Sequence, residues 1–163
     1  ENIETVTCLN ANGDLVTYPA SELEFTYRKS SLPAPVVLSA TFAVEETDPV
    51  EIRKRVKEIF KWKKKWQPLA DASAGCAFKN PFDSSGERVS AGMLIDQAGL
   101  KGLSVGGASV SKHHANFIVT SPSATARHVI ELMNEIQTRV LDATGIQLQN
   151  EVVIWSSDEA ISR

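Results

Sequence analysis

The sequence contains few of the residues from which disulfide frameworks and metal sites are built. Its 163 residues include only two cysteines, Cys8 and Cys76, and three histidines. Two isolated cysteines form no CxxC pair and make a poor disulfide framework, so a reducing, cytoplasmic setting is expected. The histidines do not occur with the spacing of a zinc site, and no metal site is predicted.

Long apolar runs and an excess of positive charge are also missing. No segment approaches the length of a membrane span, and the first residues lack the layout of a signal peptide. The net charge of −3 is unlike that of a nucleic-acid-binding protein. A hydrophobic fraction of 42% beside 23% charged residues is typical of a soluble globular protein. Because the chain begins at Glu1, directly in a strand-like alternation, we expect a piece of a longer protein.

The remaining pattern predicts alternating strands and helices of the α+β class, with helices packed on a mainly antiparallel sheet. Strands are expected at 3–9, 14–18, 36–45, 105–108, 115–119 and 149–155, and a short helical turn at 21–24. Helices are expected at 48–65, at 90–98 and from a cap at 120–123 to Gly145. Apolar residues at helical spacing face inward in the last helix, namely Val129, Leu132, Met133, Ile136 and Val140.

The helix expected at 48–65 has a strongly basic face. Asp48 is the expected N-cap and Pro49 the first helical residue. The basic residues are Arg53, Lys54, Arg55, Lys57, Lys61, Lys63, Lys64 and Lys65. Such a face is typical either of a solvated helix surface or of a site for nucleic acid or phosphate. No recognition motif accompanies it, so the solvated surface is favoured, with Lys64 or Lys65 reaching into a site.

The central stretch of the chain is 72–81, where small residues precede a thiol, a cation and an amide. Cys76 lies there on an expected turn, followed by Lys79 and Asn80. Cys76 is interpreted either as a reactive group or as a small buried hydrophobe. Together with Arg28 and Glu151 it would supply a proton donor, a fixed cation and a carboxylate. Such a set suits an acidic, conjugated substrate.

A second hypothesis for the thiol uses the two adjacent histidines. His113 or His114 could take the proton from Cys76, as in thiol hydrolases. Neighbouring residues of a strand point to opposite faces, so at most one imidazole would reach the thiol. A packing role is the more common one for such a histidine. The pair Gly106 and Gly107 lacks the spacing of a dinucleotide-binding or P-loop motif.

Several segments in a fixed order resemble the UDP-N-acetylenolpyruvoylglucosamine reductase family. They are 27–30, 67–68, 73–81, 91–102, 105–111, 114–119 and 151–155. The resemblance implies a cytoplasmic bacterial flavoenzyme of peptidoglycan synthesis that uses FAD and NADPH. The implied reaction reduces UDP-N-acetylglucosamine enolpyruvate to UDP-N-acetylmuramate.

The resemblance also implies roles for individual residues. Arg28 matches the arginine beside the enolpyruvyl carboxylate, and Glu151 matches the active-site glutamate. Cys76 falls where the family usually has the serine that protonates the substrate carbon. Further substrate contacts are expected from Tyr27, Asn80 and Lys64, with Lys65 as the alternative lysine. A thiol is a stronger acid than a hydroxyl, so the donor role survives the exchange.

The family's flavin site lies mainly in a preceding part that this chain does not contain. Residues 1–66 are therefore expected to be the end of a flavin-binding domain, and 67–163 a substrate-binding domain. The alternative is a non-catalytic UDP-sugar-binding module without its flavin domain.

Overall fold

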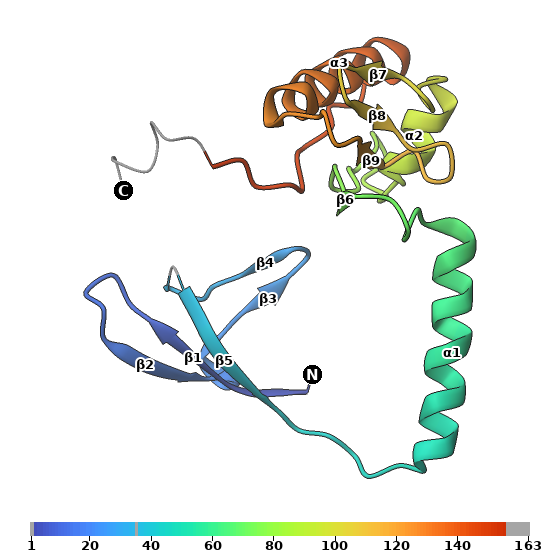
Figure 1. Cartoon of the computed structure of the whole chain (residues 1–163). Coiled ribbons are helices and arrows are strands. Elements are labelled where there is room, and N and C mark those ends of the chain that lie inside the picture. Colours follow the sequence, from blue (N-terminus) through green and yellow to red (C-terminus); the bar gives the residue numbers. More distant parts are fainter. Residues whose placement is uncertain (1, 35, 156–163) are drawn as a thin grey trace. The chain divides into compact units, whose positions relative to one another are not determined.

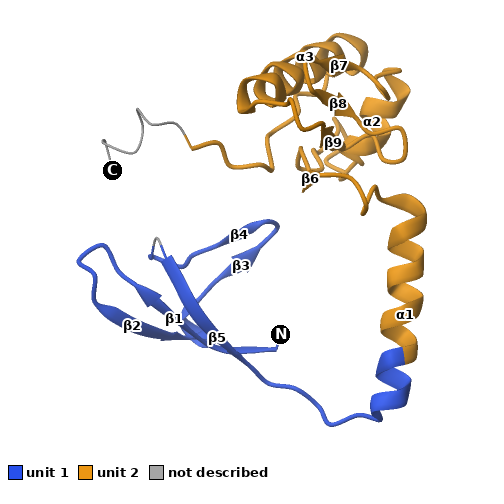
Figure 2. Ribbon diagram, viewed as in Figure 1, with its two compact units in different colours: residues 1–53 blue, residues 54–163 orange. Residues whose placement is uncertain are grey.

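The computed structural model describes residues 2–34 and 36–155. The chain forms two compact units, Glu1–Arg53 and Lys54–Arg163 (Figure 2). The division falls inside a helix rather than at residue 66, and the predicted domain boundary stays a prediction.

Unit 1 is built on a three-stranded antiparallel sheet in the order β2-β1-β5. Strand β1 spans Ile3–Leu9, β2 spans Leu15–Pro19 and β5 spans Val36–Phe42. The turn between β1 and β2 is held by Asn10, whose Oδ1 accepts from the backbone N–H groups of Asn12 and Asp14 at 2.9 Å each. The expected hairpin is confirmed, whereas β5 ends at Phe42 instead of residue 45.

A second, smaller hairpin follows the sheet in unit 1. The 3-10 turn η1, Ala20–Glu22, leads to β3, Phe25–Thr26, which pairs with β4, Lys29–Ser30. Arg28 lies in the two-residue connection and has φ = 58°. Among the residues that the structure describes, it is the only non-glycine residue with a positive φ. A positive φ at the second central position is the signature of a type II turn, where glycine is usual.

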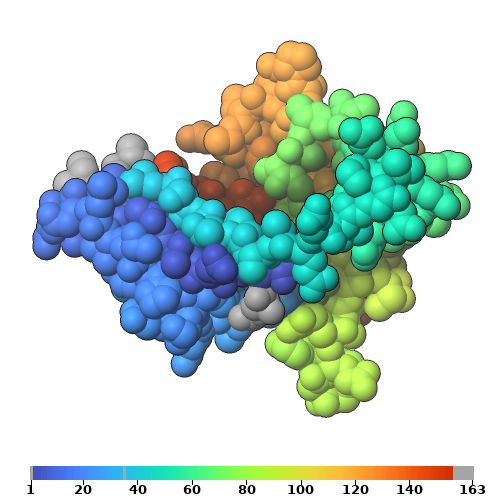
Figure 3. Space-filling model, turned by 90° about the horizontal axis from the view of Figure 1, so that it is seen from below, coloured from blue at the N-terminus to red at the C-terminus, as the bar shows by residue number. Residues whose placement is uncertain are grey.

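The basic helix α1 spans Pro49–Trp66, as expected. Asp48 begins it, because Asp48 Oδ1 accepts from the backbone N–H of Val50 at 2.9 Å. None of its residues is buried, and Figure 3 shows its side chains, in teal, at the surface. The apolar side chains Ile52, Val56, Ile59 and Phe60 therefore lie exposed beside the basic face.

Unit 2 contains a four-stranded antiparallel sheet in the order β6-β9-β8-β7 and two further helices (Figure 1). The strands are β6 Ser73–Cys76, β7 Ser104–Val105, β8 Ala108–Val110 and β9 Phe117–Thr120. Helix α2 spans Ala91–Gln97 and α3 spans Ala126–Thr144. The α+β class is confirmed.

Helix α3 supplies much of the core of unit 2. Leu132, Met133, Ile136 and Val140 are buried on its inner face, as its sequence period predicts, and Val129 is partly buried. Gly145 ends the helix in the left-handed conformation. The predicted cap at 120–123 was wrong: Thr125 is the N-cap, because its side chain accepts from the His128 backbone N–H while His128 Nδ1 accepts from Thr125 N–H.

Two predicted strands were wrong. Residues 106–107 form a tight turn between β7 and β8, and an added Cβ on Gly107 would lie 2.6 Å from the backbone nitrogen of Ala124. Residues 149–155 form no strand, only an isolated bridge between Asn150 and Phe78. Beyond Glu151 the apolar side chains at 153–155 are exposed.

Candidate functional site

The stretch 72–81 enters unit 2 as an edge strand, not as the expected turn. Strand β6 pairs with β9, and Cys76 lies opposite Phe117. Gly75 has φ = 84°, and nothing lies within 4 Å of the position of an added Cβ. The glycine is therefore required by its backbone conformation, and it breaks the regular register just before the half-buried Cys76.

A buried amide fixes the backbone directly after Cys76. Asn116, 3% exposed, accepts from Phe78 N–H through Oδ1 at 2.9 Å and donates through Nδ2 to Phe78 O at 2.8 Å. Its own carbonyl accepts from Ala77 N–H at 2.8 Å. The sequence analysis gave Asn116 no role. The signal was present, because a polar residue inside an apolar strand segment must have its hydrogen bonds satisfied.

The same backbone segment positions Glu151. The Glu151 N–H donates to Ala77 O at 2.8 Å, and Lys79 N–H donates to Gln149 O at 2.9 Å. Glu151 is half-buried, and its carboxylate oxygen Oε2 is shielded from solvent. Glu151 is thus hydrogen-bonded to Ala77, the residue that follows Cys76, although Cys76 and Glu151 are 75 positions apart in the sequence.

Asn80 is the next residue after Lys79, and its side chain links this segment to helix α2. Its Oδ1 accepts from the Ala91 backbone N–H, at the first residue of α2, at 3.0 Å. This bond satisfies one of the N–H groups that every helix start leaves without a partner inside the helix. Asn80 therefore has a structural role in addition to the predicted substrate contact.

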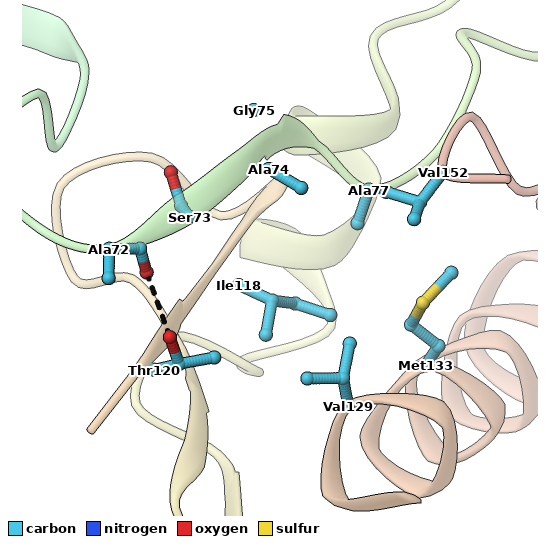
Figure 4. Close-up of a pocket in the computed structure, with 10 residues that line it drawn as sticks. All are labelled: Ala72, Ser73, Ala74, Gly75, Ala77, Ile118, Thr120, Val129, Met133 and Val152. Carbon is cyan, nitrogen blue, oxygen red and sulfur yellow. Dashed lines mark hydrogen bonds between the residues drawn. The ribbon is translucent and has the colours of Figure 1, made fainter. Parts of the chain in front are cut away.

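The small residues 72–75 border an apolar cavity of about 300 Å³ (Figure 4). Ile118 and Thr120 of β9 and Val129 and Met133 of α3 face it, and Val152 closes one side. Thr120 anchors its edge, where Thr120 N–H donates to Ala72 O at 2.9 Å. Cys76 does not line this cavity, although its neighbours Gly75 and Ala77 do.

A second cavity, of about 340 Å³, lies at the end of helix α1. Lys64 and His113 are on its rim, and the segment 67–71 forms one wall. Lys65 points elsewhere, with its Nζ 4.8 Å from the centroid of the Trp66 ring. Of the two lysines that the sequence left open, Lys64 is the one that lines a cavity.

The two adjacent histidines lie in the turn before β9. His113 is exposed, whereas His114 is half-buried and packs edge-on against Phe117, with ring centroids 4.8 Å apart. Burial lowers the pKa of His114 below its ordinary value. His114 Nδ1 accepts from Asn116 N–H at 3.2 Å. The lone pair of His114 Nδ1 is therefore used by a hydrogen bond inside the turn. This favours a packing role for His114 over the role of a base that takes the proton from Cys76.

The structure brings together Cys76, Asn80 and Glu151, while Tyr27 and Arg28 belong to unit 1. Cys76 and Glu151 thus contribute a half-buried thiol and a partly shielded carboxylate to neighbouring positions of the same backbone segment. Among residues 2–34 and 36–155, no group of histidines, cysteines and carboxylates is arranged to hold a metal ion. In the same ranges no helix combines the length and apolarity of a membrane crossing.

Comparisons with known proteins give a consistent family. Residues 67–155 match the family model described as UDP-N-acetylenolpyruvoylglucosamine reductase, C-terminal domain. The reductase of that name from Chlamydia felis is 43% identical over 155 residues, which are 93% of this chain and 49% of the relative. The one from Clostridium beijerinckii is 38% identical, over 96% of this chain and 50% of the relative.

A solved structure supports the same relationship. The crystal structure of UDP-N-acetylenolpyruvylglucosamine reductase from Thermus caldophilus matches with a TM-score of 0.78 and 39% identity. The match covers 95% of this chain and 53% of that one. The chain thus spans about half the length of the relatives that it matches.

Proposed function

Because the chain belongs to the UDP-N-acetylenolpyruvoylglucosamine reductase family, we propose that it supplies the substrate side of that reductase. The substrate would be UDP-N-acetylglucosamine enolpyruvate and the product UDP-N-acetylmuramate, in bacterial cytoplasmic peptidoglycan synthesis. The observation that carries the proposal is the pair of hydrogen bonds from Glu151 to Ala77 and from Lys79 to Gln149. They tie the backbone of Glu151 to Ala77, the residue that follows Cys76, and this backbone proximity supports the proposal.

Reduction of the enolpyruvyl double bond adds a hydride to one carbon and a proton to the other. Cys76 is proposed to give the proton, since a thiol is a stronger acid than the hydroxyl group of a serine. Arg28 and Glu151 are proposed to stabilise the charge that develops on the enolpyruvyl group during this step. Residues 67–163 would be the substrate domain and 1–66 the end of the flavin domain.

Three side chains are proposed to bind the rest of the substrate. Lys64, on the rim of the cavity at the end of α1, is proposed to contact the diphosphate. Asn80, whose Oδ1 accepts from the Ala91 backbone N–H, is proposed to contact the substrate through its amide. Tyr27, in the β3–β4 turn beside Arg28, is proposed to contact the substrate from unit 1.

FAD reduced by NADPH would supply the hydride, but the described residues do not fit a flavin site of their own. The one glycine pair, Gly106 and Gly107, is closed by its own surroundings: added Cβ atoms would lie 2.6 Å from His128 and from Ala124. These two glycines are therefore accounted for by close packing inside the chain. We propose that FAD and NADPH bind to polypeptide equivalent to the half of the relatives that this chain does not match.

The alternative function is a UDP-sugar-binding module without turnover. It is supported by the family-model match, which covers residues 67–155 and is described as the C-terminal domain of the reductase. The two proposals share the nucleotide-sugar site and differ in whether reduction follows binding.

Visible absorption spectroscopy separates them. The full chain is combined with the unmatched half of the Chlamydia felis reductase and FAD, and NADPH and the enolpyruvyl nucleotide are added in turn. Reductase function predicts that the flavin absorption bleaches with NADPH and recovers with the nucleotide. Binding of the nucleotide without recovery supports the module, and no binding at all contradicts both.

A further inference from the structure

Helix α1 differs in charge from the rest of the chain. It contains eight of the 17 lysine and arginine residues but only two of the 20 acidic residues, Glu51 and Glu58. Outside α1, acidic residues therefore outnumber basic ones, and the net charge of the whole chain is −3. An anionic ligand is consequently attracted to α1 and repelled by the average charge of the remaining residues.

Four lysines form a stripe along one face of α1. Lys54, Lys57, Lys61 and Lys64 follow one another at intervals of three, four and three residues, and all four are exposed. We name them the α1 lysine stripe. Like charges four residues apart, as in Lys57 and Lys61, destabilise a helix slightly. Helix stability therefore does not explain the stripe, and the pattern indicates a role outside the helix.

The α1 lysine stripe leads to the cavity at the end of the helix. Lys64, its last member, lines that cavity together with His113 and Asp71. An adjoining cavity of about 320 Å³ shares His113 and Asp71 and is also lined by Lys112. Two lysines and one aspartate therefore line the two cavities, and this balance of charge suits an anionic group.

We propose that Lys54, Lys57 and Lys61 guide the diphosphate group of a nucleotide sugar to the cavity at the end of α1, where Lys64 contacts it. The proposal rests on the proposed function for the identity of the ligand, and it gives a task to three lysines that do not line the cavity. The diphosphate and the enolpyruvyl carboxylate are both anionic. Positive charges beside a site raise the association rate of such a ligand by about tenfold or more, and salt screens the effect.

The geometry of α1 predicts how much each lysine contributes. With a rise of about 1.5 Å per residue, Lys61, Lys57 and Lys54 lie about 5 Å, about 10 Å and about 15 Å along the helix axis from Lys64. The Debye length at physiological ionic strength is about 8 Å. The effect on association should therefore be largest for Lys61, smaller for Lys57 and smallest for Lys54.

The test measures binding rates of the full chain by stopped-flow fluorescence. The probe is UDP with a fluorophore on its ribose, and competition with UDP-N-acetylglucosamine enolpyruvate shows that both bind at one site. The wild-type association rate should fall at least about fivefold between about 20 mM and about 300 mM salt. At low salt, Lys57→Gln combined with Lys61→Gln should lower the association rate at least about threefold and change the dissociation rate less than about twofold.

Single substitutions provide the matched controls. Lys61→Gln should slow association more than Lys54→Gln, and Arg127→Gln, which removes the same charge from the exposed start of α3, should leave both rates within about 1.5-fold of wild type. Equal effects of all three variants, association that does not depend on salt, or a change confined to dissociation overturns the guiding role. In each of these cases the nucleotide still binds, and the proposed function stands. A wild-type chain that binds neither nucleotide overturns both.

Discussion

The backbone N–H of Glu151 donates to the carbonyl oxygen of Ala77 at 2.8 Å, one residue after Cys76. This main-chain hydrogen bond ties the backbone of one proposed catalytic residue to the residue that follows the other. Exchange of the Cys76 side chain leaves the bond in place, because Cys76 takes no part in it.

Replacing Asn116 by alanine should destabilise unit 2 strongly. The change leaves the buried N–H and carbonyl of Phe78 without the two hydrogen bonds that Asn116 makes. Each such loss costs about 1–3 kcal/mol. Denaturant unfolding of Asn116→Ala should show a drop of about 2–5 kcal/mol, against less than about 0.5 kcal/mol for the exposed Asn134→Ala. Equal effects in the two variants would contradict the role of Asn116.

Arg28→Gly should separate stability from function. Arg28 holds φ = 58°, a conformation that costs a non-glycine residue about 1 kcal/mol and costs glycine little. The variant should unfold at equal or higher denaturant concentration, while substrate reduction by the assembled reductase falls at least a hundredfold. Arg28→Lys keeps the strain and the charge and should lose less activity. A variant that loses stability and keeps activity would remove Arg28 from the site.

The stability of unit 2 should depend on the protonation of His114. Burial lowers its pKa, so the unfolded chain binds more protons than the folded one just below pH 6.5. The free energy of unfolding should therefore fall as the pH is lowered through 6.5 and level off below the folded-state pKa. Urea unfolding between pH 5 and 8 measures this slope. His114→Gln should reduce this slope, and an unchanged slope in that variant would contradict the role of His114.

Gly107→Ala should be more damaging than Gly99→Ala. A Cβ on Gly107 meets the backbone of Ala124 at 2.6 Å, and backbone cannot move aside cheaply. Overpacking of this kind costs about 1–3 kcal/mol or more. Gly99 has φ = 72° with nothing within 4 Å, so its substitution adds backbone strain alone. A thermal-unfolding comparison in which Gly99→Ala is the worse variant would refute the tight contact between the β7–β8 turn and the backbone of Ala124, just before α3.

Periodic segments could be predicted from the sequence, and segments held by distant partners could not. Helix α3 and the β1–β2 hairpin follow from local spacing and turn residues, and both are confirmed. Residues 149–155 have strand-like composition, yet Asn150 makes only a single bridge to Phe78. Whether such a segment becomes a strand depends on what lies beside it, and local sequence does not contain that information.

The candidate site shows the same limit. The residue types of Cys76 and Glu151 were visible in the sequence, but the ladder through Ala77 that joins them was not. Asn116 escaped notice because its partner, Phe78, is 38 positions away. The positive φ of Arg28 also depends on pairing of β3 with β4 rather than on its own preference.

The most direct measurement compares the variants Cys76→Ala and Cys76→Ser with the wild type in the assembled reductase. Two rates are followed separately: reduction of the flavin by NADPH, and its reoxidation by the enolpyruvyl nucleotide. The chain variants are combined with the unmatched half of the Chlamydia felis relative, FAD and NADPH. Both should allow reduction of the flavin at the wild-type rate. With the enolpyruvyl nucleotide, Cys76→Ser should form product within about tenfold of wild type, and Cys76→Ala at least about a hundredfold more slowly. Product formation by Cys76→Ala at the wild-type rate would show that Cys76 is not the proton donor.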